Sequence, residues 1–172
     1  DKAVKELGVS NPQDIVLEFL TTDNDNARIQ AEVIQDQLQR NLDIVIDIRQ
    51  VPYKQRLEME DKREFEMVFS GWAPDYDDPY TYLGLFASDS PYNQISYKSE
   101  KYDELLQIST LSQDPKERMD AMFEAEKTLL EDAAIVPLQM RRIAWLKDPK
   151  VKGLVRSYVG PREDYVFADI VE

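Results

Sequence analysis

The chain has 172 residues, 42% of them hydrophobic, which is enough to bury one sizeable core, so its length predicts a single domain. Its 34 acidic and 21 basic residues give a net charge of −13, which opposes binding to nucleic acid and to anionic membrane surfaces. Because the sequence has no cysteine and no histidine, it excludes a Cys/His zinc site, a cysteine nucleophile and a Ser-His-Asp triad within the chain.

The first part of the chain predicts a strand, a helix and a second strand. Apolar residues alternate over 15–20, and we expect Ile15, Leu17 and Phe19 to face a core. The polar residues 23–26 offer an N-cap to a helix with an apolar stripe, and alternation returns over 44–51 until Pro52 ends it. A strand–helix–strand unit of this kind places its two strands parallel in one sheet.

Further strands and helices alternate along the rest of the chain. Helices are predicted over 54–61 and 80–87 and from Ser99 and Asp114, strands over 65–69, 135–138, 143–146 and 165–171, and a turn at 147–149. Asp114 and Glu117 have the spacing of a reciprocal capping box. In the helix over 80–87, which Asp78 and Pro79 would start, the residues expected to face inward are Tyr82, Leu83 and Phe86. This alternation predicts an α/β fold.

Residues 71–79 form an unusually acidic loop directly after the predicted strand over 65–69. Ligands of open α/β sheets usually bind outside the carboxyl ends of the strands, which is where this loop begins. One interpretation is a clamp for a cationic ligand, with Asp75 partly desolvated beside Trp72. The other is a plain acidic loop in which Asp78 caps a helix and Trp72 packs in the core.

Other chemistries are weighed on the same residues. Asp75, Asp77 and Asp78 could offer oxygen ligands to a hard cation, although two prolines restrict their loop. Residues 23–25 fail the calcium-loop template and are better explained as a helix cap. A hydrolase with paired carboxylates needs a fixed separation that nothing in the sequence sets. Either Arg141 or Arg142 could bind a ligand carboxylate, but adjacent strand residues point to opposite faces.

Residues 69–79 resemble the Gly-Trp-x-x-Asp-Tyr-x-[Asp/Glu]-Pro loop of the solute-binding proteins that serve oligopeptide and dipeptide ABC transporters. Segments that resemble the same family, in the same order, are 23–26, 97–106, 118–129 and 135–138. The resemblance implies an α/β fold that is one lobe of a two-lobed, class II periplasmic-binding-protein-like clamshell, with a mixed sheet flanked by helices. Residues 1–172 would be its C-terminal ligand-binding lobe, and Asp1 in place of a start methionine suggests a piece of a longer protein.

The resemblance also implies a binding site on the acidic loop. Asp75 would pair with the α-ammonium group of a peptide, Gly71 and Ala73 would offer backbone groups, and Trp72 would line a side-chain pocket. Tyr53 stands where the family often has an aromatic residue that packs on ligand side chains. The peptide would lie extended, in the manner of an added strand.

By the same resemblance we expect a protein that is not an enzyme and needs no cofactor. Its partners would be an oligopeptide and, through the full-length receptor, an ABC permease, and it would be a monomer in the periplasm or lipid-anchored at the cell surface. The chain departs from the family pattern at Ala27, Phe69 and Gln139-Met140-Arg141, and Phe69 stands where some oligopeptide binders carry an arginine that binds ligand carboxylates. Relatives that bind nickel, haem or sugars share the fold, so a non-peptide solute stays an alternative.

Overall fold

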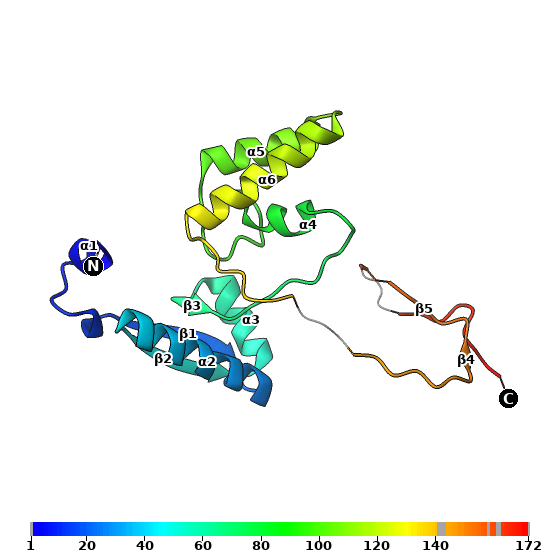
Figure 1. Cartoon of the computed structure of the whole chain (residues 1–172), viewed down its shortest axis with the longest axis horizontal. Coiled ribbons are helices and arrows are strands. Elements are labelled where there is room, and N and C mark those ends of the chain that lie inside the picture. Colours follow the sequence, from blue (N-terminus) through cyan, green and yellow to red (C-terminus); the bar gives the residue numbers. More distant parts are fainter. Residues whose placement is uncertain (1, 141–143, 158, 161–162, 172) are drawn as a thin grey trace. The chain divides into compact units, whose positions relative to one another are not determined.

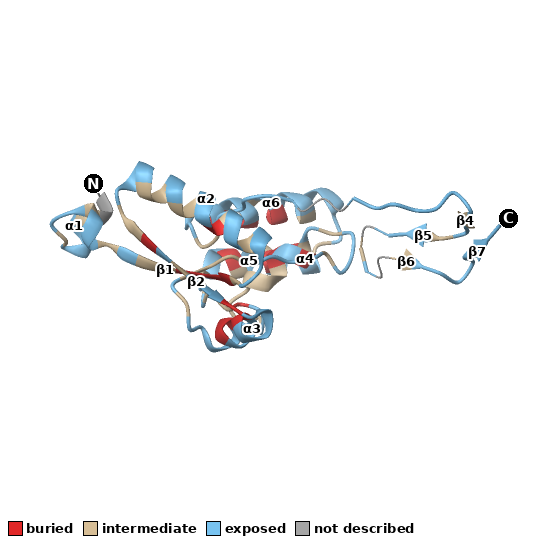
Figure 2. Cartoon of the chain, turned by 90° about the horizontal axis from the view of Figure 1, so that it is seen from below, coloured by how far each residue is buried: buried red, intermediate tan, exposed pale blue. Residues whose placement is uncertain are grey.

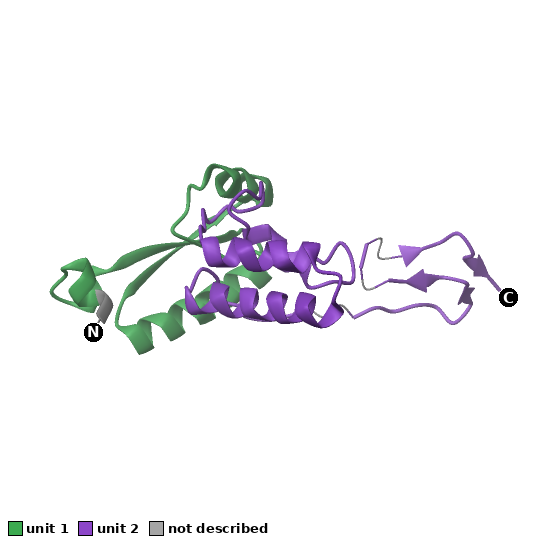
Figure 3. Cartoon of the chain, turned by 90° about the horizontal axis from the view of Figure 1, so that it is seen from above, with its two compact units in different colours: residues 1–71 green, residues 72–172 purple. Residues whose placement is uncertain are grey.

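The computed structural model describes residues 2–140, 144–157, 159–160 and 163–171 (Figure 1). The chain divides into two compact units, residues 1–71 and residues 72–172 (Figure 3). Each unit has its own secondary structure and its own buried residues. The prediction that residues 1–172 together form one lobe of a larger protein stays a prediction.

The first unit is built on a three-stranded parallel sheet. Strands β1 (Val16–Thr22), β2 (Val45–Val51) and β3 (Met67–Val68) stand in the order β2-β1-β3. Helix α2 (Asp25–Leu42) connects β1 to β2, and α3 (Tyr53–Lys62) connects β2 to β3. A short helix α1 (Lys2–Leu7) and a 3-10 turn (Pro12–Asp14) precede the sheet. The predicted strand–helix–strand unit is confirmed, whereas the strand predicted over 65–69 has only two paired residues.

The two connecting helices cover opposite faces of this sheet (Figure 2). Ala31 of α2 packs with Phe19 and Ile46 on one face. On the other face, Leu20 and Met59 pack together with Val51. Successive residues of a strand point to opposite faces, so the central strand β1 is buried on both. The predicted core positions Leu17 and Phe19 do belong to the first face, but the alternating pattern gave no sign of the second.

Helix α2 begins and ends as its sequence requires. The Asn24 side chain accepts a hydrogen bond from the Ala27 N–H over 2.9 Å, which satisfies one of the free donors of the first turn. Asp43 ends the helix in the left-handed conformation with φ 56°, where its N–H still donates to the Gln39 carbonyl. The predicted cap within 23–26 is therefore confirmed.

The second unit centres on two long helices that run side by side (Figure 1). They are α5 (Glu100–Leu111), capped by Ser99, and α6 (Pro115–Glu131), capped by Asp114. Before them lie α4 (Tyr80–Leu83) and a 3-10 turn (Gly84–Phe86). The buried residues that these helices share are Leu83, Tyr102, Leu106, Met122, Ala125 and Leu129. All of them except Leu83 come from the apolar stripes of α5 and α6.

Two local predictions in this unit are wrong. The helix predicted over 80–87 is a four-residue α-helix followed by a 3-10 turn. Tyr82 is 36% exposed, because the inward face of this segment carries Tyr80, Leu83 and Phe86 and Tyr82 lies off that face. The reciprocal capping box is also absent. The Asp114 N–H donates to the Ser112 hydroxyl over 3.1 Å, and the Glu117 carboxylate accepts from that same hydroxyl.

The C-terminal part of the second unit has short antiparallel ladders. Strand β4 (Val151–Lys152) pairs with β7 (Asp169–Ile170), and β5 (Val155–Arg156) pairs with β6 (Glu163–Asp164). No strand forms over 135–138 or 144–146, and residue 143 lies outside the described residues. The strand predicted over 165–171 is reduced to the two residues of β7. The predicted turn is confirmed, since the Asp148 carboxylate accepts from the Lys150 N–H over 2.8 Å.

The predicted α/β class is confirmed, with parallel pairing inside the three-stranded sheet and antiparallel pairing in the two separate ladders. Among the described residues, no helix is both long enough and apolar enough to span a membrane.

Candidate ligand-binding site

The carboxyl edge of the sheet brings two predicted site residues, Tyr53 and Gly71, to one side of the first unit. Because β1 lies between β2 and β3, the chain leaves β1 for one neighbour and returns past it to the other, and open α/β sheets bind ligands at such a switch point. Tyr53 follows the end of β2, and Gly71 follows the end of β3. Parallel strands end at the same edge, so both residues lie where the sequence placed a site.

Tyr53 is 59% exposed and is held from within its own helix. The Arg56 guanidinium lies 5.2 Å from the centre of the Tyr53 ring. Arg56 in turn forms a buried ion pair with Glu60, and its Nη1 donates to the Ser70 hydroxyl over 3.2 Å. Burial raises the pKa of Glu60, against the opposing effects of Arg56 and Ser70. The pair thus links α3 to Ser70, the residue before the acidic loop.

Gly71 and Ala73 have backbone groups that are open to a partner. Both residues are exposed, and no hydrogen bond joins their N–H or C=O groups to another residue that the structure describes. A side chain built on Gly71 would meet nothing within 4 Å, so the space above its backbone is open. They continue the chain from β3, which pairs with β1 on one side within the described sheet.

Asp75 is positioned by its backbone and not by its carboxylate. Its N–H donates to the Thr81 hydroxyl over 3.1 Å, and Thr81 is 5% exposed in the first turn of α4. The Asp75 carboxylate is exposed, with no ion pair or hydrogen bond to any described residue. The predicted partial desolvation beside Trp72 is therefore wrong for this chain taken alone.

Trp72 does not lie in the core. Its indole is 38% exposed and meets the ring of Tyr92 edge-on, with centroids 5.1 Å apart and planes at 64°. Edge-to-face aromatic pairs of this kind hold rings in fixed orientation while leaving a face available. This contradicts the alternative in which Trp72 packs in the core.

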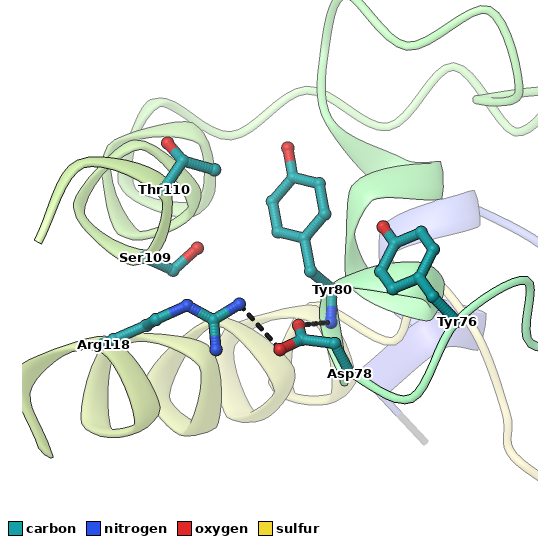
Figure 4. A pocket seen from close by; sticks show the side chains of 6 residues that line it. All are labelled: Tyr76, Asp78, Tyr80, Ser109, Thr110 and Arg118. Atoms are coloured by element: carbon teal, nitrogen blue, oxygen red, sulfur yellow. Dashed lines mark hydrogen bonds and ion pairs between the residues drawn. The ribbon is translucent and has the colours of Figure 1, made fainter. Parts of the chain in front are cut away.

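Asp78 is committed to the structure of the loop (Figure 4). One carboxylate oxygen accepts from the Tyr80 N–H over 2.9 Å, and the other lies 2.8 Å from Nη2 of Arg118. The hydrogen bond from Arg118 is the main cause that lowers the pKa of Asp78. The predicted capping role of Asp78 is confirmed, with α4 beginning at Tyr80. Asp75 and Asp77 remain as the exposed carboxylates of the loop.

Sequence reasoning missed Arg118, although the sequence holds a signal for it. Arg118 precedes Ala121, Met122 and Ala125 by three, four and seven residues, so it stands in line with the buried stripe of α6. A charged residue on such a stripe needs a partner. That partner is Asp78. Both side chains are partly exposed and line a pocket of about 390 Å³ together with Tyr76, Tyr80, Ser109 and Thr110 (Figure 4).

The remaining candidates give no second site. Among the described residues, no three acidic side chains gather closely enough to hold a metal ion, and this includes Asp75, Asp77 and Asp78. Arg141 and Arg142 lie outside the described residues.

The comparison with protein families decides what this arrangement belongs to. Residues 1–94, which include Tyr53 and the whole acidic loop, match the family of bacterial extracellular solute-binding proteins, family 5, in its middle region. The chain belongs to this family. The resemblance read from the acidic loop is thereby confirmed.

Similar sequences and solved structures support the same family assignment. The chain is 33% identical over 157 residues to the dipeptide-binding protein of Lactococcus lactis, covering 89% of this chain and 28% of that protein. It is 39% identical to the Listeria monocytogenes OppA bound to peptide, with a TM-score of 0.85 over 99% of this chain and 32% of that one. An oligopeptide ABC transporter substrate-binding domain from Bacillus anthracis gives 37% identity and a TM-score of 0.88, covering 99% of this chain and 33% of that one. The chain therefore spans about a third or less of each of these three proteins.

Proposed function

We propose that this chain is part of the solute-binding component of an ABC importer, which captures oligopeptides outside the cytoplasm and delivers them to a membrane permease. The observation that carries the proposal is the exposed, unpaired carboxylate of Asp75 on a backbone that is held by Thr81. A carboxylate held in this way is a ready partner for an ammonium group. The relatives named as dipeptide- and oligopeptide-binding proteins support a peptide as the source of that group.

The rest of the loop suits the main chain of a peptide. Gly71 and Ala73 offer N–H and C=O groups that are free of partners among the described residues, and an extended peptide carries the same groups in alternation. The exposed rings of Trp72 and Tyr53 offer apolar surface to its side chains. Contacts of this kind favour binding of many sequences, because they recognise the backbone and the N-terminus and not particular side chains.

The exposure of Asp75 sets a limit on what the chain does alone. An ion pair in open solvent contributes about 0–1 kcal/mol, whereas a desolvated pair at an interface contributes several kcal/mol. We therefore assign residues 1–172 to the C-terminal lobe of a two-lobed receptor whose other part covers the bound peptide. The receptor acts as a monomer, without a cofactor and without catalysing a reaction, and the closed form is what the permease receives.

Calorimetry on the full-length receptor tests the assignment of Asp75. We expect Asp75→Ala to weaken binding of a short alanine peptide by at least about 2 kcal/mol, because a charged partner is lost from a desolvated pair. Asp77→Ala is the matched control, since Asp77 is a second exposed, unpaired carboxylate in the same loop, and it should leave affinity unchanged. Equal affinity of the Asp75→Ala and wild-type receptors would overturn the assignment.

Native mass spectrometry of the receptor purified from its own cells tests the ligand class. A mixture of co-purified peptides supports peptide capture. A single metal ion, haem or glycan in their place would contradict peptide capture. It would indicate that the receptor uses the same fold to bind a non-peptide solute.

A further inference from the structure

Arg118 reaches the acidic loop from a different element. It is the first residue in line with the buried stripe of α6, and its guanidinium lies 2.8 Å from the Asp78 carboxylate. The stripe that follows it is anchored in the core through Ala121, Met122 and Ala125, whose exposed fractions are 6%, 2% and 0%. Arg118 therefore projects from one of the most firmly packed helices of the unit (Figure 4).

A continuous set of hydrogen bonds leads from Asp78 to Asp75. The Asp78 carboxylate accepts from the Tyr80 N–H over 2.9 Å, and the Asp78 carbonyl accepts from the Thr81 N–H over 3.1 Å. Thr81 then accepts from the Asp75 N–H through its hydroxyl over 3.1 Å. Asp75 and Asp78 are thus tied to the same first turn of α4, and Arg118 ties that turn to α6.

We infer that Arg118 is a positioning residue for ligand binding: through Asp78 and the first turn of α4, it fixes the place and direction of the Asp75 carboxylate. This inference rests on the proposed role of Asp75. Arg118 does not touch the ligand in this scheme, because Asp78 occupies its guanidinium. Arg118 has a second effect on recognition, because it neutralises the Asp78 carboxylate. Asp75 is then the first carboxylate of the loop that is free to bind an ammonium group.

The role differs from that of a simple structural ion pair. The side chains of Arg118 and Asp78 are 32% and 24% exposed, and pairs at such partly exposed positions contribute little to folding. A binding site, however, loses affinity when the group that contacts the ligand is displaced by as little as about 0.5–1 Å. We therefore expect loss of Arg118 to reduce recognition of the ammonium group much more than it reduces folding.

The test measures how strongly the full-length receptor distinguishes a free N-terminus from a blocked one. The quantity is the ratio of the dissociation constants for an N-acetylated alanine peptide and for the same peptide with a free amine, measured by calorimetry. We expect Arg118→Ala to lower this ratio by about tenfold or more, the effect of losing one well-placed charge-assisted hydrogen bond. Affinity for the acetylated peptide should stay unchanged, which a general loss of structure would not allow.

Matched variants distinguish the positioning role of Arg118 from a mere effect of its charge and from an effect on the stability of the fold. Lys116→Ala removes the cation of an exposed pair with Asp120 on the same helix and should leave the ratio unchanged. Arg118→Lys keeps the charge and should restore part of the ratio. Asp78→Asn keeps an oxygen for the Tyr80 N–H and removes the ion pair, so it should lower the ratio as Arg118→Ala does, and it carries the test if Arg118→Ala does not fold.

The outcomes distinguish this inference from the proposed function. A wild-type ratio near one means that Asp75 does not bind an ammonium group, and it overturns both. A large wild-type ratio that Arg118→Ala and Asp78→Asn leave intact overturns the role of Arg118 alone and leaves that of Asp75 standing.

Discussion

The backbone N–H of Asp75 donates a hydrogen bond to the hydroxyl of Thr81 over 3.1 Å. Thr81 is 5% exposed, so its hydroxyl is directed by packing, and the loop is closed onto the helix that follows it. The side chain of Asp75 is left exposed while its main chain is fixed. A binding group with this arrangement loses little conformational freedom when a ligand arrives.

Thr81→Val tests whether this hydrogen bond matters for binding. Valine has nearly the same shape as threonine but cannot accept from the Asp75 N–H. We expect peptide affinity of the full-length receptor to fall by about 1 kcal/mol, the usual contribution of one such bond. Thr81→Ser keeps the hydroxyl and should retain most of the affinity in the same titration. A Thr81→Val receptor that binds a short alanine peptide as tightly as the wild type would show that the bond has no part in recognition.

Local periodicity was sufficient for most helices but not for strands. The stripe of Ala121, Met122, Ala125 and Leu129 is visible in the sequence, because a helix satisfies its backbone hydrogen bonds within itself. A strand needs a partner, and the sequence of residues 135–138 does not say whether one is present. Val136 is 74% exposed, and no strand forms there. The β-branched composition of that segment only weakly favours a strand, and no strand pairs with it in the part of the chain that the structure describes.

The candidate site was predictable where the signal was local. The cap by Asp78 follows from an aspartate and a proline before a helix, and the structure confirms it. The environment of Trp72 was not predictable, because its contact with Tyr92 depends on how a loop folds back within the unit. Arg118 and Arg56 were missed because each finds its charge partner only once the face of its helix is buried.

Arg56→Ala should destabilise the first unit strongly. Arg56 and Glu60 have side chains that are 8% and 3% exposed, so removing the cation leaves a buried carboxylate without its counter-charge. We expect the free energy of unfolding by urea to fall by about 3–5 kcal/mol. Burial raises the pKa of Glu60, which means that the buried carboxylate is unfavourable when it is charged. Glu60 therefore needs Arg56 beside it to stabilise the fold.

Arg28→Ala is the control for that substitution. Arg28 and Glu32 have the same i,i+4 spacing on α2, but their side chains are 45% and 50% exposed. An exposed pair of this type contributes little to stability because solvent screens it, so the variant should unfold almost as the wild type does. Similar losses in Arg28→Ala and Arg56→Ala would contradict the argument from burial.

Tyr102→Phe tests the link between α5 and α4. The Tyr102 side chain is fully buried, and its hydroxyl donates to the Leu83 carbonyl over 2.7 Å. Phenylalanine keeps the edge-to-face contact with Tyr97 but removes the hydrogen bond to the Leu83 carbonyl, so we expect a loss of about 1 kcal/mol in the free energy of unfolding. Tyr92→Phe removes a hydroxyl from a residue that is 56% exposed and should change stability little. A neutral Tyr102→Phe variant would mean that the hydroxyl makes no net contribution.

The pairing of Asp78 with Arg118 predicts a specific dependence of stability on pH. Arg118 lowers the pKa of Asp78 below the usual aspartate value of about 3.9, so the folded chain favours the ionised form more than the unfolded chain does. A lowered pKa stabilises the folded state at every pH above the unfolded value, and this contribution is lost as pH falls through the folded value.

The measurement is the difference in the free energy of unfolding between the wild type and Asp78→Asn, which keeps the capping oxygen and removes the charge. All other acidic groups titrate in both proteins, so the difference reports Asp78. It should be constant above about pH 5 and shrink below about pH 4. A difference that stays constant to lower pH, or that grows, would show that the ion pair does not stabilise the folded chain.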